Sequence, residues 1–229
     1  NELSKTNAEL DSFVYKASHD LRSPLSSILG LAEIASKMDD VNEIKSCITM
    51  IKDRVNVQDR FIKDIIDYAR NSRQELTFEK VKLKAKVTQI IDSLIYNEGA
   101  RGIDFKVAIP DDLEIVSDPI RLSVIFSNLI GNAIKYQDST KEYRNVVIGL
   151  VPASKALEVY VEDNGIGIEE QYHSKIFTMF FRATEKSKGS GLGLFIVKES
   201  VQKLGGSIGF ASTVGKGTVF TFNLPNKVN

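Results

Sequence analysis

The sequence has few of the features that cross-link a chain or anchor it. Its 229 residues include one cysteine, Cys47, so no intrachain disulfide can form, which suits a reducing compartment. No apolar run approaches the roughly 18 residues of a membrane-spanning helix, and no signal-peptide pattern opens the chain. Thirty basic residues balance thirty acidic ones, so the net charge gives no reason to expect nucleic acid as a partner.

Proline and glycine are nearly absent from the first 72 residues, which contain only Pro24 and Gly30. Apolar residues recur there in alternating steps of three and four, the spacing of a helical-bundle seam. The predicted seam consists of Val14, Ala17, Leu21, Pro24, Ile28, Leu31 and Ala35, and then of Ile44, Cys47 or Ile48, Ile51, Val55, Gln58, Ile62, Ile65 and Ala69. The polar break MDDVNE, residues 38–43, joins two such helices and predicts an antiparallel hairpin.

This hairpin is predicted to form a domain of its own, residues 1–72. Two helices alone bury little apolar surface, and a second copy would complete a four-helix bundle, so we expect a homodimer. The alternative is that the hairpin packs on the rest of the chain.

From about Leu76 onward, short β-rich runs are separated by helical stretches. The runs cover residues 103–109, 145–151, 157–163, 206–213 and 217–225, and the helical stretches cover residues 83–97, 119–136 and 192–204. Asp118 followed by Pro119 is a favourable N-cap and first-turn pair. Residues 73–229 are therefore predicted to form an α/β sandwich, a mixed sheet covered on one face by helices. With the hairpin before it, the chain belongs to the α+β class.

The stretch NLIGNAIKY, residues 128–136, places polar side chains on one stripe of a predicted helix. Asn128 and Asn132 are four residues apart, and Lys135 and Tyr136 follow on the same face. An amide oxygen can ligate Mg²⁺, a lysine can meet a phosphate, and a tyrosine ring can cover a planar base. The alternative is the solvated polar face of an ordinary helix.

Glycines mark two further stretches. In VEDNGIGI, residues 161–168, a strand ends at Asp163, and Gly165 and Gly167 allow a ligand to approach the backbone closely. In GSGLGL, residues 189–194, three glycines lead into a helix whose N-terminus favours phosphate. No strand leads directly into the glycines of GSGLGL, as a Rossmann fingerprint requires, and no Lys-Ser/Thr pair follows them, as in a P-loop, so the pattern alone is weak. VEDNGIGI alone is also compatible with an ordinary glycine turn.

The polar stretch RATEKSKGS lies directly ahead of these last glycines and carries Arg182, Lys186 and Lys188. It is interpreted as a mobile cationic lid over a phosphate chain, the alternative being an ordinary surface loop. None of these patterns is decisive alone, but their order and spacing together indicate a nucleotide site.

With these stretches in this order, the sequence closely resembles the catalytic core of the sensor histidine kinases of two-component signalling. ASHDLRSPL resembles the H-box, NLIGNAIKY the N-box, DNGIG the G1 box, IFTMFFR the F-box and GSGLGL the G2 box, and GTVFTF resembles the closing strand. The resemblance covers essentially the whole chain. It implies the Bergerat ATP-binding fold, with ATP as the phosphate donor and Mg²⁺ beside it.

The resemblance also implies roles for individual residues. His19 would accept the phosphoryl group, with Asp20 as the base that orients and deprotonates it, and Arg182 would reach the γ-phosphate. Asn132 would hold Mg²⁺, and Asp163 would bind the adenine amino group. The other residues implied in the nucleotide site are Asn128, Lys135, Tyr136, Gly165, Gly167, Lys188, Gly189, Gly191, Leu192, Gly193 and Thr218.

Two positions depart from the family pattern. Asp20 replaces the commoner glutamate, which shortens the reach of the carboxylate by one methylene. Ser23 stands where many members have threonine or asparagine, a position tied to dephosphorylation of the partner regulator, so phosphatase activity stays open.

The resemblance implies partners beyond the second copy of the hairpin. They are a response-regulator receiver domain, which takes the phosphate on an aspartate, and a sensor domain upstream in a full-length protein that can be membrane-anchored. This segment is expected in the cytoplasm, where ATP is.

His19 falls at an outward position relative to the seam, so its ring should face water, as a phosphate acceptor requires. Asp20 lies about 100° around the helix and can reach the ring only through a favourable rotamer or a deformed helix. Pro24 cannot donate to the carbonyl of Asp20 and its ring clashes there, so we expect a bend just after the histidine. His173, the second histidine, is expected to be inert.

Two other functions remain open from the sequence. One is a plain ATPase of the same fold, and the other is a catalytically silent or phosphatase-biased dimer scaffold. The intact motifs argue against silence, and substitution of His19 distinguishes a kinase from an ATPase.

Overall fold

The computed structural model describes residues 2–96, 98–151, 157–183 and 189–224, which divide into two compact units. Among the described residues, the first unit comprises those up to Tyr68 together with Gly189 and Ser190, and the second comprises those from Ala69 to Ala183 and from Gly191 onward. This division falls a few residues before the boundary predicted from the sequence.

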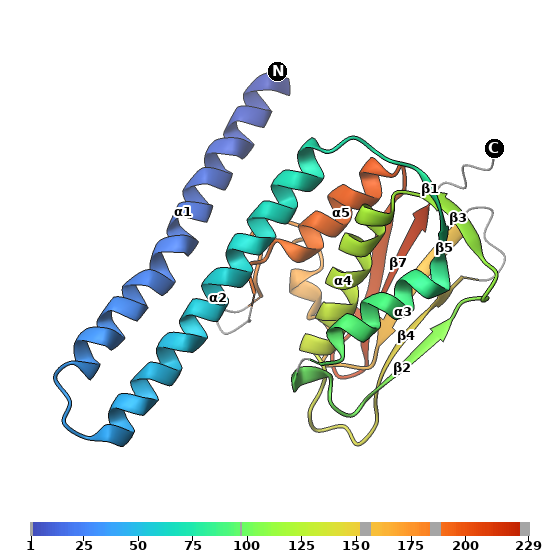
Figure 1. Cartoon of the computed structure of the whole chain (residues 1–229). Helices are drawn as coiled ribbons and strands as arrows, with labels where there is room; N and C mark the ends of the chain where they lie inside the picture. Colours follow the sequence, from blue (N-terminus) through green and yellow to red (C-terminus); the bar gives the residue numbers. More distant parts are fainter. Residues whose placement is uncertain (1, 97, 152–156, 184–188, 225–229) are drawn as a thin grey trace. The chain divides into compact units, whose positions relative to one another are not determined.

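The first unit is built on the two long helices α1 (Glu2–Ala35) and α2 (Val41–Arg73), which form an antiparallel hairpin (Figure 1). Asp40 caps the N-terminus of α2, because its Oδ1 accepts from the backbone N–H groups of Asn42 at 2.7 Å and Glu43 at 3.0 Å. This is the geometry of a helix N-cap. The hairpin predicted from the heptad spacing is confirmed.

The seam of the hairpin agrees with the prediction only in part. Ala17 and Cys47 are buried, and the predicted α1 positions from Leu21 to Ala35 are half-buried. Exposed within one chain are Val14, Val55, Ile62 and Ala69, and for these the seam stays a prediction of the dimer. The reason is geometric, since two helices cover only one side of an apolar stripe. Cys47, and not Ile48, lies on the buried side of α2.

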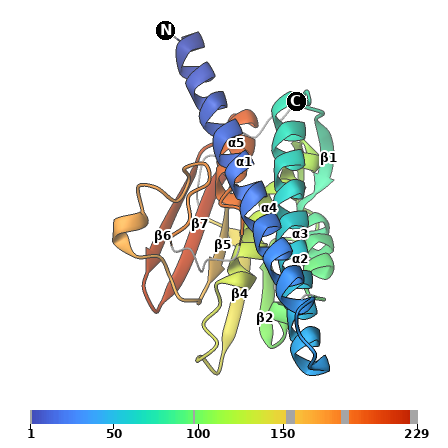
Figure 2. The same ribbon diagram turned by 90° about the vertical axis from the view of Figure 1, so that its left-hand side faces the viewer.

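The second unit is the predicted α/β sandwich. Five strands form a sheet in the order β2-β4-β5-β7-β6, visible in Figure 2, in which β2 and β4 are parallel and the other pairs antiparallel. The strands are β2 (Ile103–Ala108), β4 (Arg144–Leu150), β5 (Leu157–Asp163), β6 (Ile208–Thr213) and β7 (Gly217–Leu224). Helices α3 (Leu83–Leu94), α4 (Pro119–Lys135) and α5 (Gly193–Lys203) cover one face of this sheet (Figure 1). Two short strands that we did not predict, β1 (Glu79–Lys82) and β3 (Glu114–Ser117), pair antiparallel in a second sheet.

The core of this unit lies between α4 and the sheet. The α4 residues buried there recur at helical spacing, and they are Leu122, Ile125, Phe126, Leu129, Ile130, Ala133 and Ile134. Opposite them, alternate side chains of β5 and β7 point inward, and the Phe126 ring meets Phe222 edge-on at 5.6 Å between centroids. Each fully buried side chain of this size stabilises the fold by about 1.5–3 kcal/mol. The core therefore fixes α4, and with it the polar stripe near its C-terminal end.

The first turn of α4 carries a buried ion pair that also binds the preceding chain. Asp118 Oδ1 accepts from the backbone N–H groups of Ile120 and Arg121, and Oδ2 accepts from Arg121 Nη1 at 2.8 Å and from the N–H of Thr77 at 3.0 Å. Arg121 Nη2 donates to the carbonyl of Gln74 at 2.6 Å. Burial raises the pKa of Asp118, but the N–H groups and the guanidinium outweigh it, so this pKa lies below its ordinary value. The pair therefore holds residues 74–77 at the N-terminus of α4.

Candidate active site

The carboxylate of Asp163 ends strand β5, directly opposite Thr218 on β7. Its Oδ1 accepts from the backbone N–H of Gly165 at 2.8 Å, and the N–H of Thr218 also bonds the carboxylate. Burial raises the pKa of Asp163 to about 6, although these N–H groups and the charge of Lys141 act to lower it. At neutral pH the site therefore offers an ionised acceptor at the end of a strand.

The turn after Asp163 is packed tightly against its neighbours. A Cβ added at Gly165 would lie 2.2 Å from the carbonyl oxygen of Tyr136, and one at Gly167 would lie 2.2 Å from that of Thr213. Gly167 also has a φ of +73°. Close backbone packing therefore already requires both glycines, whereas the sequence suggested the approach of a ligand as the reason.

The polar stripe of α4 faces the start of α5. Asn128 Nδ2 donates to the carbonyl of Val124 at 2.8 Å. Its Oδ1 lies beside Gly193, because a Cβ added at Gly193 would be only 2.7 Å from this oxygen. Asn132 is half-buried one turn further along. Lys135 Nζ donates to Tyr136 Oη at 2.8 Å and lies 4.4 Å from the centroid of that ring.

Helix α5 begins at Gly193, within one residue of the predicted start. Leu192 is fully buried at the N-cap position, and its apolar side chain offers no capping hydrogen bond. Gly191 has a φ of +73°, and a Cβ there would lie 2.7 Å from the carbonyl oxygen of Phe181. Gly189 also has a positive φ, +132°. The predicted lid residues Lys186 and Lys188 lie outside the described residues.

Arg182 is exposed, and its charge acts on the neighbouring phenol of Tyr136. Burial raises the pKa of Tyr136, and the Arg182 guanidinium opposes that rise without cancelling it. The structure thus brings together the C-terminal half of α4, the turn after β5, the start of β7, the start of α5 and Arg182, which are the segments expected to form one nucleotide site.

The sequence analysis did not identify Ser212, whose hydroxyl joins the turn after β5 to the start of β7. Its hydroxyl lies 2.9 Å from Thr218 Oγ1, donates to the carbonyl of Gly217 at 3.0 Å and accepts from the N–H of Ile168 at 2.8 Å. Thr218 is buried, and its hydroxyl lies within hydrogen-bond distance of the Ser212 hydroxyl. A serine at an alternating strand position carries no signal that would have identified it.

The predicted phosphate acceptor lies on α1 in the first unit. The His19 side chain is 71% exposed, and its Nδ1 is 3.1 Å from Asp20 Oδ1. A favourable rotamer is therefore enough to bring the carboxylate to the ring. Helix α1 continues through Pro24, so the expected bend stays a prediction. Ser23 is exposed on the same helix.

His173, expected from the sequence to be an inert surface histidine, is half-buried in the structure. Its Nε2 lies 3.0 Å from the carbonyl oxygen of Ile168, and its ring meets Phe210 edge-on at 5.0 Å between centroids. The ring is thus occupied in packing and backbone contacts.

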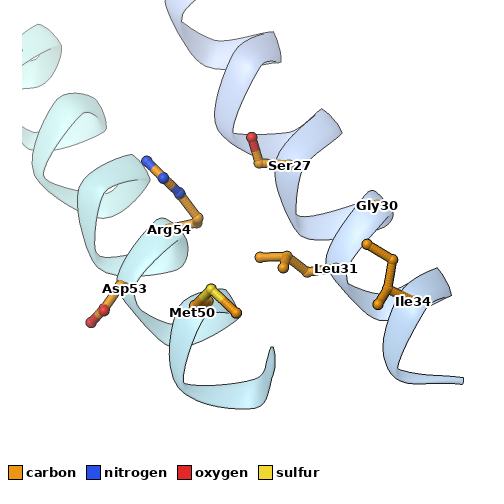
Figure 3. Close-up of a pocket in the computed structure, with 7 residues that line it drawn as sticks. All are labelled: Ser27, Gly30, Leu31, Ile34, Met50, Asp53 and Arg54. Carbon is orange, nitrogen blue, oxygen red and sulfur yellow. The ribbon is translucent and has the colours of Figure 1, made fainter. Parts of the chain in front are cut away.

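An open hollow of about 390 Å³ lies between α1 and α2 (Figure 3). Its lining consists of Ser27, Gly30, Leu31, Ile34, Met50, Asp53 and Arg54. Leu31 and Met50 point toward one another across it, whereas Asp53 lies on the outer side of α2 (Figure 3). Ser23, Ser27, Gly30 and Ile34 follow His19 in steps of three and four, so the α1 wall continues the face that carries the histidine.

Two family models match the chain. One, "His Kinase A (phospho-acceptor) domain", matches residues 9–74, and the other, "Histidine kinase-, DNA gyrase B-, and HSP90-like ATPase", matches residues 117–228. The chain belongs to the sensor histidine kinases. The matched regions are the catalytic core of that family, as the motifs suggested. Of the described helices in this histidine kinase core, none is long and apolar enough to cross a membrane.

The relatives of this histidine kinase core are longer proteins. It is 35% identical over 97% of its length to cyanobacterial phytochrome B of Nostoc sp., and 33% identical over 98% to the methanogenesis regulatory histidine kinase FilI of Methanothrix harundinacea. The chain spans only 30% and 25% of these two proteins.

Two solved structures show the same fold. The histidine kinase ThkA, in complex with the response regulator protein TrrA, matches with a TM-score of 0.77 at 24% identity, over 98% of this chain and 64% of that one. The histidine kinase AdeS of Acinetobacter baumannii matches with a TM-score of 0.68 at 21% identity, over 92% of this chain and 98% of that one.

Proposed function

We propose that this histidine kinase core transfers the γ-phosphoryl group of ATP to His19 and then to an aspartate of a response-regulator receiver domain. The observation that carries the proposal is the exposed His19 ring with its Nδ1 against the Asp20 carboxylate. A neutral imidazole whose Nδ1–H is held by a carboxylate presents the lone pair of Nε2 to solvent. That arrangement makes it a nucleophile.

The second unit supplies the nucleotide site in this proposal. Asp163 accepts a hydrogen bond from the adenine amino group, with Thr218 beside it, and the ring of Tyr136 packs against the base. The N-terminus of α5, with Gly191 and Gly193, binds the phosphates through backbone N–H groups and the helix dipole.

The transfer step forms a bond from His19 Nε2 to the γ-phosphorus and breaks the bond from that phosphorus to the β–γ bridging oxygen, so that ADP leaves. Asp20 stabilises the positive imidazole ring through its Nδ1 proton. Lys135 and Arg182 offset the phosphate charge, and Lys135 exchanges the Tyr136 hydroxyl for a phosphate oxygen. Such transfer depends mainly on positioning and charge neutralisation.

The residues present fit a bound Mg²⁺ in which Asn132 provides the protein ligand. In the described parts of the chain, no cluster of three or more histidine, cysteine or acidic side chains could hold a metal. Mg²⁺ retains several waters and shares phosphate oxygens, so one amide oxygen is a fitting contribution. The ion would neutralise charge on the triphosphate.

The raised pKa of Asp163 predicts a pH dependence of nucleotide binding. The ionised carboxylate is the better acceptor for the adenine amino group, so ATP affinity should be constant above about pH 7. It should fall by up to about tenfold for each pH unit below about 6, as the carboxylate becomes protonated. Calorimetric titration with ATP between pH 5 and 8 measures this. Asp163→Asn should bind ATP weakly at every pH. If the ATP affinity of this variant still fell below pH 6 as in the wild type, the assignment would be contradicted.

The homodimer is proposed from an exposed heptad stripe on α2. Val41, Ile48, Val55 and Ile62 are spaced by seven residues, and their exposed fractions lie between 42% and 62%. Seven-residue spacing is typical of a seam between helices. A second hairpin would cover this stripe, which supports a four-helix bundle.

We expect the double substitution Ile48→Asp and Ile62→Asp to convert the dimer to a monomer, because it would bury two unpaired carboxylates in the bundle. Light scattering behind size exclusion gives the mass. Thr49→Asp, also exposed on α2 but off the stripe, is the control and should remain dimeric. A monomeric wild type would refute the bundle.

The hollow between α1 and α2 is the proposed contact for the receiver domain. It continues the His19 face and combines the apolar side chains Leu31, Ile34 and Met50 with Arg54. The complex of ThkA with TrrA supports a receiver domain as the partner of this fold. The relatives are three to four times longer, which supports our proposal that the full protein has a sensor domain upstream of this core.

The test of the proposed function uses the purified chain, Mg²⁺ and ATP labelled at the γ-phosphate. The chain should retain label, and a receiver domain added afterwards should remove it within minutes and become labelled in turn. ATP hydrolysis without retained label would identify a plain ATPase.

A further inference from the structure

Lys141 lies in the connection between α4 and β4, outside every motif described above. Its Nζ is within hydrogen-bond distance of three backbone carbonyl oxygens, those of Asn164 at 2.5 Å, Gly165 at 3.3 Å and Gly215 at 2.7 Å. An ammonium group has three donors and no acceptor, so each N–H has a carbonyl to meet. The residue is half-buried, and its positive charge also acts on the carboxylates of Asp163 and Asp138.

The three carbonyls come from two different segments. Asn164 and Gly165 belong to the turn that follows Asp163, and Gly215 belongs to the connection between β6 and β7 that leads to Thr218. The two segments also meet directly, since the N–H of Gly215 donates to the carbonyl of Ile166 at 2.8 Å. Lys141 therefore joins the segment beside Asp163 to the segment beside Thr218 through its ammonium group.

The turn after Asp163 has neutral supports as well. Asn164 Oδ1 accepts from the N–H of Asn145 at 2.9 Å, its Nδ2 donates to the carbonyl of Tyr143 at 2.8 Å, and the N–H of Ile166 donates to the carbonyl of Tyr136 at 3.0 Å. These bonds hold the turn to α4 and β4. Lys141 adds charge-assisted bonds, which are about twice as strong as neutral ones, and extends them to the β6–β7 connection.

We propose that Lys141 is a positioning residue for the nucleotide base, a role that rests on the nucleotide site proposed above. Its ammonium fixes the spacing between the turn after Asp163 and the start of β7, and it does so through backbone carbonyls without touching the ligand. Loss of the ammonium leaves three converging carbonyls that repel one another and loosens both walls of the base pocket. The consequence is weaker ATP binding with unchanged phosphoryl-transfer chemistry.

Lys141→Ala should raise the Kd and KM for ATP about tenfold, a change of about 1.4 kcal/mol, with kcat for autophosphorylation within about twofold of wild type. Lys141→Met, which keeps the stem but lacks donors, should do the same if the alanine variant folds poorly. Lys216→Ala is the matched control, an exposed lysine next to Gly215 that should leave the Kd unchanged.

Chemical rescue separates positioning from general stability. Propylammonium at tens of millimolar replaces the missing stem and ammonium of Lys141→Ala and should restore ATP affinity, whereas tetramethylammonium, which has no N–H, should not. An unchanged Kd in Lys141→Ala, a loss confined to kcat, or a loss that propylammonium leaves uncorrected would each overturn the proposal. A wild-type chain that binds no ATP would refute the proposed function instead, so the two failures are distinguishable.

Discussion

His19→Gln is expected to abolish incorporation of phosphate from ATP into the chain, while ATP binding stays at the wild-type level. Glutamine occupies a similar volume and can still reach Asp20, but its amide nitrogen is not a nucleophile. The site is exposed, so the substitution should not disturb folding. Retained radioactivity after gel electrophoresis measures incorporation, and calorimetric titration measures binding.

The sequence contains a matched control for this substitution. His173→Gln removes the other of the two histidines, and the chain should still become labelled because that ring has a packing role. Label that persists in His19→Gln and disappears in His173→Gln would reverse the assignment. Persistent ATP hydrolysis with normal turnover in His19→Gln would favour an ATPase.

Arg121→Met is expected to lower the free energy of unfolding of the second unit by about 3–5 kcal/mol, the usual cost of removing one partner of a buried ion pair. The Arg121 and Asp118 side chains are both 2% exposed, and the variant leaves the Asp118 carboxylate buried without its counter-ion. The carbonyl of Gln74 also loses its donor. Urea unfolding followed by circular dichroism measures the change.

An exposed ion pair in the same unit provides the comparison. Lys84 Nζ lies 2.9 Å from Asp111 Oδ1, but the Asp111 side chain is 90% exposed. Lys84→Met should therefore change the free energy of unfolding by less than about 1 kcal/mol. Equal effects of the two substitutions on the free energy of unfolding would mean that the Arg121 pair does not hold residues 74–77 as described.

The motifs could be located from the sequence because each depends on local spacing. Asn128 and Asn132 share a helix stripe by period alone, and glycines leading into an apolar helix indicate its start at Gly193. The outward position of His19 followed from the heptad in the same way. Helices and long strands carry their periodicity within 10 to 20 residues, so the order of elements was predictable as well.

What the sequence could not provide is pairing between distant segments. Cys47 and Ile48 both fit a pattern that alternates steps of three and four residues. Only the position of the partner helix decides which of the two side chains is buried. Strands β1 and β3 have four residues each, too few for a clear alternation. Lys141 lies in a polar loop 74 positions from Gly215, and no local pattern indicates that their atoms meet.

The location of the phosphate on the wild-type chain tests the central claim most directly. After incubation with Mg²⁺ and ATP at neutral pH, peptide mapping by mass spectrometry under alkaline conditions should find one phosphoryl group, on the peptide that contains His19, and brief acid treatment should remove it. A phosphate that survives acid, or that maps to a serine, threonine or any peptide without His19, would contradict the account.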